Sequence, residues 1–176
     1  LRDRRRHPLE ELVPVAVECG LLVPMISGRA LGATGGTLDK LESIPGMRTD
    51  LSPARFEAQV AELGGCFGAQ TCDVVPADRM LYAMRDATAT IDSVPLIVSS
   101  ILSKKLAEGL RGVVIDVKCG RGAFMRTPSD ALSLAAALET VGRSMGASVK
   151  TVVTAMGDPL GLAVGNALEV EEAIHV

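Results

Sequence analysis

The chain has 176 residues, of which 48% are hydrophobic and 22% charged, and its formal net charge is −3. That length and composition suit a folded domain with a proper core. The negative charge and the scarcity of aromatic side chains (one Tyr, three Phe and no Trp) argue against a nucleic-acid platform. No apolar run approaches the length of a membrane span, and no signal-peptide pattern opens the chain, so we expect no membrane partner.

The four cysteines lack the Cys-x-x-Cys spacing of metal and redox sites, and only two histidines accompany them. We therefore interpret Cys19, Cys66, Cys72 and Cys119 as free buried thiols of a cytoplasmic protein. The first 18 residues are atypical, with arginine at positions 2, 4, 5 and 6. A solvated terminus is the favoured interpretation of this run, and a basic arm for nucleic acid is the alternative.

Apolar runs and helical patterns alternate along the chain. Strands are expected at 21–26, 66–70, 112–118 and 149–155. Helices are expected at 9–18, 38–43, 52–64, 127–142 and 166–174, with two more between 78 and 106. This alternation predicts an α/β fold with a mostly parallel sheet and flanking helices. The helix pair between 78 and 106, which has no strand inside it, predicts a portion of a small helical domain.

A glycine- and threonine-rich stretch, Ser27–Gly46, follows the first expected strand and precedes a helix. Glycine lets the backbone approach a ligand closely, and the carboxyl ends of parallel strands are where ligands bind in such sheets. The Ser27 and Thr37 hydroxyls can add donors to the same anion. The pattern favours a phosphate-sized anion pocket, although many such loops are only turns.

Four blocks of the chain resemble the thymidine and pyrimidine-nucleoside phosphorylase family. They read SGRALGATGGTLDKLE from Ser27, VPADRMLYAMRDATATIDSVPLIVSSILSKKLAEG from Val75, DVKCGRGAFM from Asp116 and PLGLAVGNALEVEEA from Pro159. The resemblance implies a nucleoside phosphorylase/phosphoribosyltransferase-like fold. Residues 1–76 (with 1–18 atypical) and 110–176 would form an α/β domain, and 77–109 would belong to a helical domain that forms a homodimer.

The resemblance also implies a reaction, in which thymidine and inorganic phosphate give thymine and 2-deoxyribose 1-phosphate with no required cofactor. Arg85 and Lys104 match the catalytic positions. The residues that match the pyrimidine pocket are Tyr82, Arg85, Ser100, Lys104, Leu31 and Phe124. Ser27 and Thr37 match phosphate donors. Leu160, Ala163 and Glu172 match a site for a monovalent cation, such as potassium, in bacterial relatives.

Several of these residues have simpler interpretations. Arg85 would pair with Asp86 or Asp78 on a helix surface, Lys104 would be solvated and Phe124 would lie in the core. Asp39, Lys40 and Glu42 also lie in the first of the four family blocks. Ordinary charge on a helix surface explains them as well as a functional role does. Asp116 and Lys118 stand at a strand end, a good location with an ambiguous role.

The chain departs from the family pattern at two places. Alanine replaces a common histidine at Ala33, which removes a latch for domain closure. No Lys-x-His-Ser-Thr-Gly-Gly phosphate loop precedes Cys19, so we expect a truncated chain that is inactive alone. The alternatives are a phosphoribosyltransferase of similar fold and a non-catalytic pyrimidine-binding pseudoenzyme.

Overall fold

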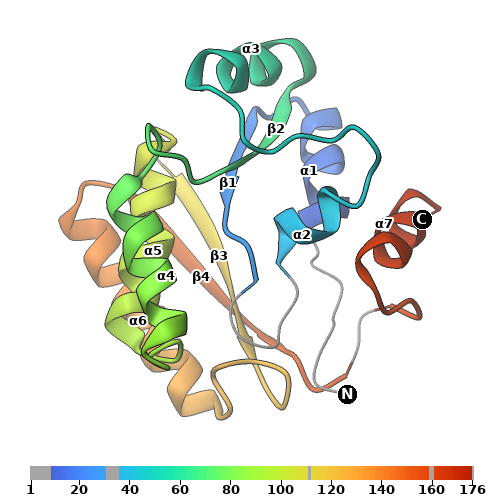
Figure 1. The fold of residues 1–176 in the computed structure, drawn as a ribbon. Helices are drawn as coiled ribbons and strands as arrows, with labels where there is room; N and C mark the ends of the chain where they lie inside the picture. The colour runs from blue at the N-terminus through green and yellow to red at the C-terminus, as the bar shows by residue number, and fades with distance from the viewer. Residues whose placement is uncertain (1–8, 31–35, 111, 159–160, 176) are drawn as a thin grey trace. The chain divides into compact units, whose positions relative to one another are not determined.

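The computed structural model describes residues 9–30, 36–110, 112–158 and 161–175 (Figure 1). The helices are α1 (Leu9–Glu18), α2 (Thr37–Leu41), α3 (Pro53–Leu63), α4 (Pro76–Ala87), α5 (Val94–Ala107), α6 (Pro128–Ser144) and α7 (Asn166–Ile174). The strands are β1 (Val23–Ser27), β2 (Gly65–Ala69), β3 (Gly112–Cys119) and β4 (Ser148–Ala155). All the predicted elements are confirmed, with ends that shift by a few residues. No helix among these residues is both long and apolar enough to cross a bilayer.

The chain divides into two compact units. The first comprises residues 1–79 and 159–176, and the second comprises residues 80–158. This division separates 159–176 from the preceding strand and groups most of the expected helical segment with β3 and β4. The predicted functional domains, 1–76, 77–109 and 110–176, stay a prediction.

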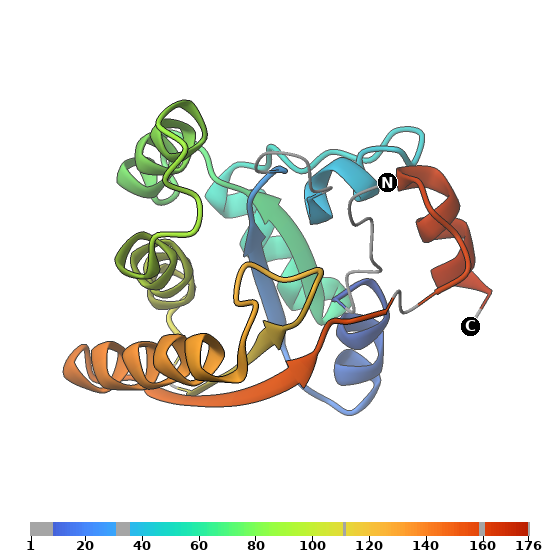
Figure 2. The ribbon, with the colours of Figure 1, turned by 90° about the horizontal axis from the view of Figure 1, so that it is seen from below.

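In the first unit, β1 and β2 run parallel and side by side, with Val23 opposite Gly65 and Ser27 opposite Ala69 (Figure 2). Helix α3 packs against β2, and α2 packs against α7. The Ser52 hydroxyl accepts a hydrogen bond from the Arg55 amide and so caps the start of α3. These contacts place the end of β1 and the start of α2 in one unit.

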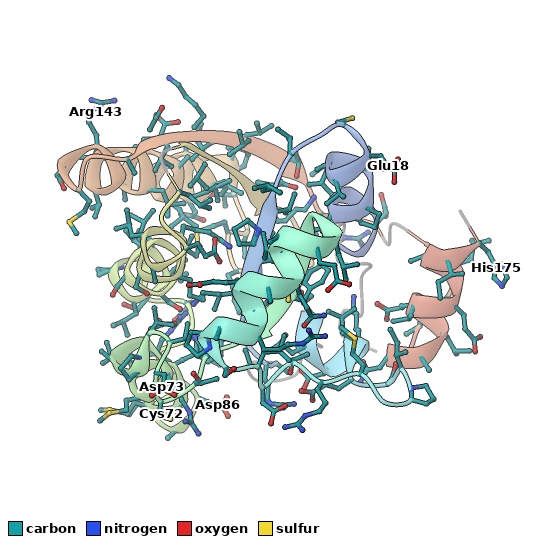
Figure 3. The ribbon with its side chains drawn as sticks, turned by 90° about the horizontal axis from the view of Figure 1, so that it is seen from above. Glu18, Cys72, Asp73, Asp86, Arg143 and His175 are labelled. Carbon is teal, nitrogen blue, oxygen red and sulfur yellow. The ribbon has the colours of Figure 1, made fainter. Side chains whose placement is uncertain are left out.

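The cysteines are free, as predicted, but their predicted burial is wrong for two of them. Cys72 is exposed (Figure 3). Cys19 is also exposed, Cys119 is half-buried and Cys66 is buried. Burial raises the pKa of the Cys66 thiol. The pattern of a single sequence does not separate a buried thiol from one on a loop.

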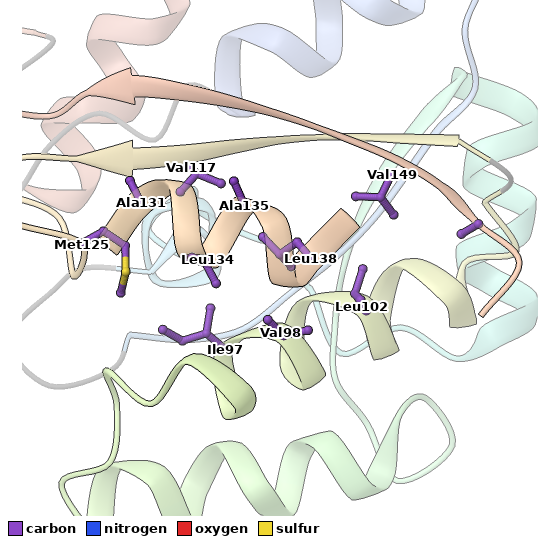
Figure 4. Packing of buried hydrophobic residues seen from close by; sticks show 11 residues of the cluster. Ile97, Val98, Leu102, Val117, Met125, Ala131, Leu134, Ala135, Leu138 and Val149 are labelled. Atoms are coloured by element: carbon purple, nitrogen blue, oxygen red, sulfur yellow. The ribbon is translucent and has the colours of Figure 1, made fainter. Parts of the chain in front are cut away.

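In the second unit, β3 and β4 form a parallel pair of eight residues each, with Gly112 opposite Ser148. Helix α6 lies along one face of this pair, and α5 packs against α6. Side chains from all four elements form the main apolar cluster, which includes Val98, Val117, Leu138 and Val149 (Figure 4). This cluster supports α5, the helix that carries two predicted site residues.

Leu138 tests the importance of this cluster, because its side chain is completely buried whereas Leu132 on the same helix is 61% exposed. We expect Leu138→Ala to cost about 2–5 kcal/mol of stability through lost burial and a cavity. Leu132→Ala should change it by about 0.5 kcal/mol or less. Thermal unfolding of the full-length protein should rank the two variants in that order, and equal unfolding temperatures would contradict this core.

Candidate active site

Four side chains of α4 and α5 converge in the second unit, and we call them the Tyr82 cluster. They are Tyr82 and Arg85 on α4 and Ser100 and Lys104 on α5. The centroid of the Tyr82 ring lies 5.8 Å from Arg85 Cζ and 5.5 Å from Lys104 Nζ. The Lys104 ammonium also donates a hydrogen bond of 2.8 Å to Ser100 Oγ. The cluster thus brings two positive charges to one aromatic ring.

Residue spacing explains how each helix contributes two members. Tyr82 and Arg85 are three residues apart and Ser100 and Lys104 four apart, so each pair shares one helix face. Arg85 Nη2 also donates a hydrogen bond to the carbonyl of Ile91, in the connection between α4 and α5. The connection therefore helps to fix the guanidinium beside the Tyr82 ring.

Burial distinguishes this cluster from ordinary surface charge. Arg85, Ser100 and Lys104 expose only 4%, 5% and 8% of their surface. The simpler interpretation, in which Arg85 lies on a helix surface and Lys104 is solvated, is therefore wrong about their location. Their long apolar stems pack inside the unit while both charged ends reach the Tyr82 ring.

The cluster has a clear chemical preference. Cations within about 6 Å of a ring face are attracted to its π electrons, but two neighbouring cations repel each other. Oxygen atoms that gain negative charge are attracted to ammonium and guanidinium groups and accept hydrogen bonds from them. Water exclusion strengthens such contacts. Side chains of this chemistry can hold a planar ligand that carries oxygen atoms.

Phe124 and Leu31 are the two residues predicted to form apolar walls around the base. Phe124 is 49% exposed and lies between β3 and α6, so its expected core position is wrong. The hydrogen bond from the Gly120 amide to the Met125 carbonyl spans the loop that holds Phe124 at the surface. Leu31 lies outside the described residues. The wall roles of both stay predictions.

The loop between β1 and α2, which is predicted to bind phosphate, belongs to the first unit. The carboxylate of Asp39 joins its two ends. Asp39 Oδ2 accepts hydrogen bonds from the amides of Ala30 at 2.7 Å and Gly36 at 3.1 Å. A Cβ on Gly36 would lie 2.5 Å from the Ala30 nitrogen, so this approach requires glycine. Residues 31–35 between them, including Ala33, lie outside the described part.

The two predicted phosphate donors stand at the outer ends of this loop. Ser27 ends β1 and is half-buried, and Thr37 begins α2 with 2% of its surface exposed. Their positions at a strand end and a helix start agree with the expected strand–loop–helix arrangement. Their role toward phosphate stays a prediction.

A second set of contacts clamps the same loop. Arg29 donates to both carboxylate oxygens of Glu42, at 2.5 and 2.8 Å, and Thr49 Oγ1 donates to Glu42 Oε1 at 2.5 Å. Hydrogen bonds from Arg29 and Thr49 lower the pKa of the Glu42 carboxyl, and the Glu42 hydrogen bond raises the pKa of Arg29. These contacts favour the ionised form of Glu42, and the Glu42 carboxylate in turn holds the loop through Arg29.

Lys40 lies in the family signature, but its burial was not predicted from the sequence. Its interpretation as helix-surface charge is wrong, because its side chain is 4% exposed and its ammonium lies 2.6 Å from Glu169 Oε2 on α7. The neighbouring Leu38 and Leu41 are also buried, so α2 is enclosed on several sides. Five residues are too few for a hydrophobic period to reveal this burial.

The predicted cation ligands lie in and before α7. Both oxygens of the Glu172 carboxylate accept backbone hydrogen bonds, one from Leu162 and one from Ala163, each at 3.0 Å. These two contacts fix the orientation of the carboxylate. Leu160 lies outside the described residues, and the described part contains no group of three or more His, Cys, Asp or Glu side chains arranged for a metal.

Asp116 and Lys118 belong to a small polar network on one face of β3 and β4. Lys118 Nζ lies 2.6 Å from Asp116 Oδ2 and donates to Thr154 Oγ1 at 3.0 Å. Thr154 Oγ1 in turn donates to Asp116 Oδ1 at 2.6 Å. These contacts explain all three side chains structurally.

Comparison with known proteins identifies the family. Residues 11–176 match the model of the glycosyl transferase family, a/b domain. The chain belongs to this family. It is 53% identical over 163 residues to a thymidine phosphorylase of Rhizobium meliloti, 54% identical over 163 residues to that of Homo sapiens, and 52% identical over 165 residues to that of Mycobacterium tuberculosis.

This member of the glycosyl transferase family covers only part of those relatives. The matches include 93%, 93% and 94% of the chain but 37%, 34% and 38% of the respective relatives. The chain thus spans little more than a third of the length of these proteins. The family match covers the described residues of both units from position 11 onward.

The lowered pKa of Glu42 predicts how acid affects the loop of this family member. Glu42 stabilises the folded state fully above the ordinary glutamate pKa, about 4.3, and this contribution is lost as the pH falls through its lower folded value. We expect Glu42→Gln to lower the unfolding temperature at pH 7 and to differ less from wild type at pH 3.5. Glu62→Gln, at an exposed position on α3, is the control. A wild-type advantage that grows in acid would contradict the clamp.

Proposed function

We propose that the protein containing this chain catalyses the phosphorolysis of pyrimidine nucleosides, converting thymidine and phosphate to thymine and 2-deoxyribose 1-phosphate. The observation that carries this proposal is the Tyr82 cluster, in which buried Arg85 and Lys104 meet one aromatic ring. The similarity of the chain to three proteins named thymidine phosphorylase also supports the proposal.

The reaction places a defined demand on the base side. A phosphate oxygen forms a bond to the anomeric carbon while the bond from that carbon to the base nitrogen breaks. The electron pair stays on the pyrimidine, whose carbonyl oxygens gain negative charge. Arg85 and Lys104 donate to these oxygens, and Ser100 orients the Lys104 ammonium through its hydrogen bond.

The phosphate side depends on hydroxyl donors in the first unit. Ser27 and Thr37 donate to the phosphate oxygens, and residues outside this chain add the positive charge that a phosphate dianion requires. Glu172 and the backbone carbonyls of Leu160 and Ala163 would hold a monovalent cation such as potassium, which would supply further positive charge. The two amide hydrogen bonds to Glu172 support this role because they fix its carboxylate.

The remaining parts of the proposal concern assembly and location. Helix α4 exposes Met80, Leu81 and Met84, by 68%, 42% and 56%. An apolar surface of this kind supports a homodimer formed through the helical segment. We place the enzyme in the cytoplasm, where its four free cysteines stay reduced.

Lys104 provides the direct test of the base pocket, with its neighbour Lys105 as a matched control. Lys105 lies on the same helix but pairs with Glu108 at 2.9 Å. In the full-length protein, Lys104→Gln should lower kcat/KM for thymidine by roughly 30- to 1000-fold, which equals about 2–4 kcal/mol of transition-state stabilisation. Lys105→Gln should lower it by about threefold or less.

Steady-state phosphorolysis assays, with thymine release followed at saturating phosphate, measure these values. Unfolding temperatures of both variants control for misfolding. Equal losses in the two variants, or no phosphate-dependent thymine release by the wild type, would contradict the proposed function.

A further inference from the structure

The first unit contains a buried ion pair that the proposed reaction does not use directly. Lys40 Nζ on α2 lies 2.6 Å from Glu169 Oε2 on α7, and their side chains expose 4% and 3% of their surface. The two residues are 129 positions apart in the chain. The pair therefore fastens together two segments that meet only through folding.

The geometry of this pair argues against a role in stability alone. The Lys40 ammonium contacts Glu169 Oε2 directly, and both side chains are withdrawn from water. A buried ion pair offsets the cost of desolvation only when its hydrogen bonds are well formed, and an apolar pair of similar size often serves stability as well. Such a pair is better suited to setting the position of the elements it joins.

The pair lies one helical turn from two predicted ligand residues. Thr37 precedes Lys40 by three residues on α2, and Glu172 follows Glu169 by three on α7. Glu169 Oε1 also accepts a hydrogen bond of 3.0 Å from the Gly165 amide, which ties it to the loop before α7. Lys40 and Glu169 thus connect the segment of the phosphate donor to the segment of the cation ligand.

We propose that Lys40 and Glu169 form a positioning pair that holds the Thr37 hydroxyl where phosphate binds. The inference rests on the proposed function, since it takes phosphate as the ligand of Thr37. Neither charge touches phosphate in this account. The pair acts by locating α2 against α7, so its loss weakens phosphate binding and leaves thymidine binding intact.

The test uses the full-length protein and two kinds of variant. Lys40→Met with Glu169→Gln removes both charges, keeps a similar volume and retains an oxygen that accepts from the Gly165 amide, so it should unfold near the wild-type temperature, whereas Lys40→Met alone should unfold well below it. Glu169→Asp keeps both charges but draws the carboxylate back by one methylene. Glu108→Asp, in the Lys105–Glu108 pair of α5, is the matched control.

Two measurements follow phosphate binding in phosphate-free buffer. One is the phosphate concentration that gives half of the maximal rise in unfolding temperature, which requires no activity. The other is KM for phosphate beside KM for thymidine. We expect the double variant and Glu169→Asp to raise both phosphate values by about ten- to a hundredfold, because small displacements of a binding group have large effects. KM for thymidine and the Glu108→Asp control should stay within about twofold.

Wild-type phosphate values in a folded double variant or in Glu169→Asp would overturn the inference and leave the pair a purely structural role. A wild-type protein whose unfolding temperature does not respond to phosphate would also overturn it. A wild type that responds to phosphate but releases no thymine would refute the proposed function alone, and the phosphate midpoints of the variants would still decide the role of the pair.

Discussion

Removing a lysine or arginine head group from water costs several kcal/mol. These side chains are therefore rarely buried unless other groups interact with their charge. Among the residues that the structure describes, Lys40, Arg85 and Lys104 are buried. Lys40 meets the carboxylate of Glu169, whereas Arg85 and Lys104 both approach the ring of Tyr82. Both parts of the proposed site depend on these desolvated charges, which are retained despite their cost.

The two units use different means to hold their functional groups. In the Tyr82 cluster, two helices supply the side chains, and residue spacing on each helix determines which of them share a face. On the phosphate side, the loop ends at Ala30 and Gly36 share one carboxylate oxygen of Asp39, and Glu42 holds Arg29. The proposed phosphorolysis requires both kinds of support, since one set of groups must stabilise a leaving base and another must hold an anion.

Most of the fold could be predicted because strong local patterns specify it. Apolar runs predicted β3 and β4, and Ser52 with Pro53 predicted the start of α3. The buried location of Arg85 and Lys104 could not be predicted from local patterns, since such residues are normally solvated, and only the family resemblance indicated it. Neither the local pattern nor the family signature, in which Lys40 lies, predicted its burial and its pairing with Glu169. Its helix is too short to show a period, and its partner Glu169 lies in a distant segment that only folding brings close.

The Tyr82 cluster is the proposed binding site of the pyrimidine. The most direct measurement is a crystal structure of the full-length protein with thymine and phosphate bound. If the Tyr82 cluster binds the pyrimidine, we expect Lys104 Nζ and the Arg85 guanidinium within about 3.2 Å of the thymine oxygens, with the base next to Tyr82. Thymine bound elsewhere, with Arg85 and Lys104 in contact only with protein groups, would contradict it.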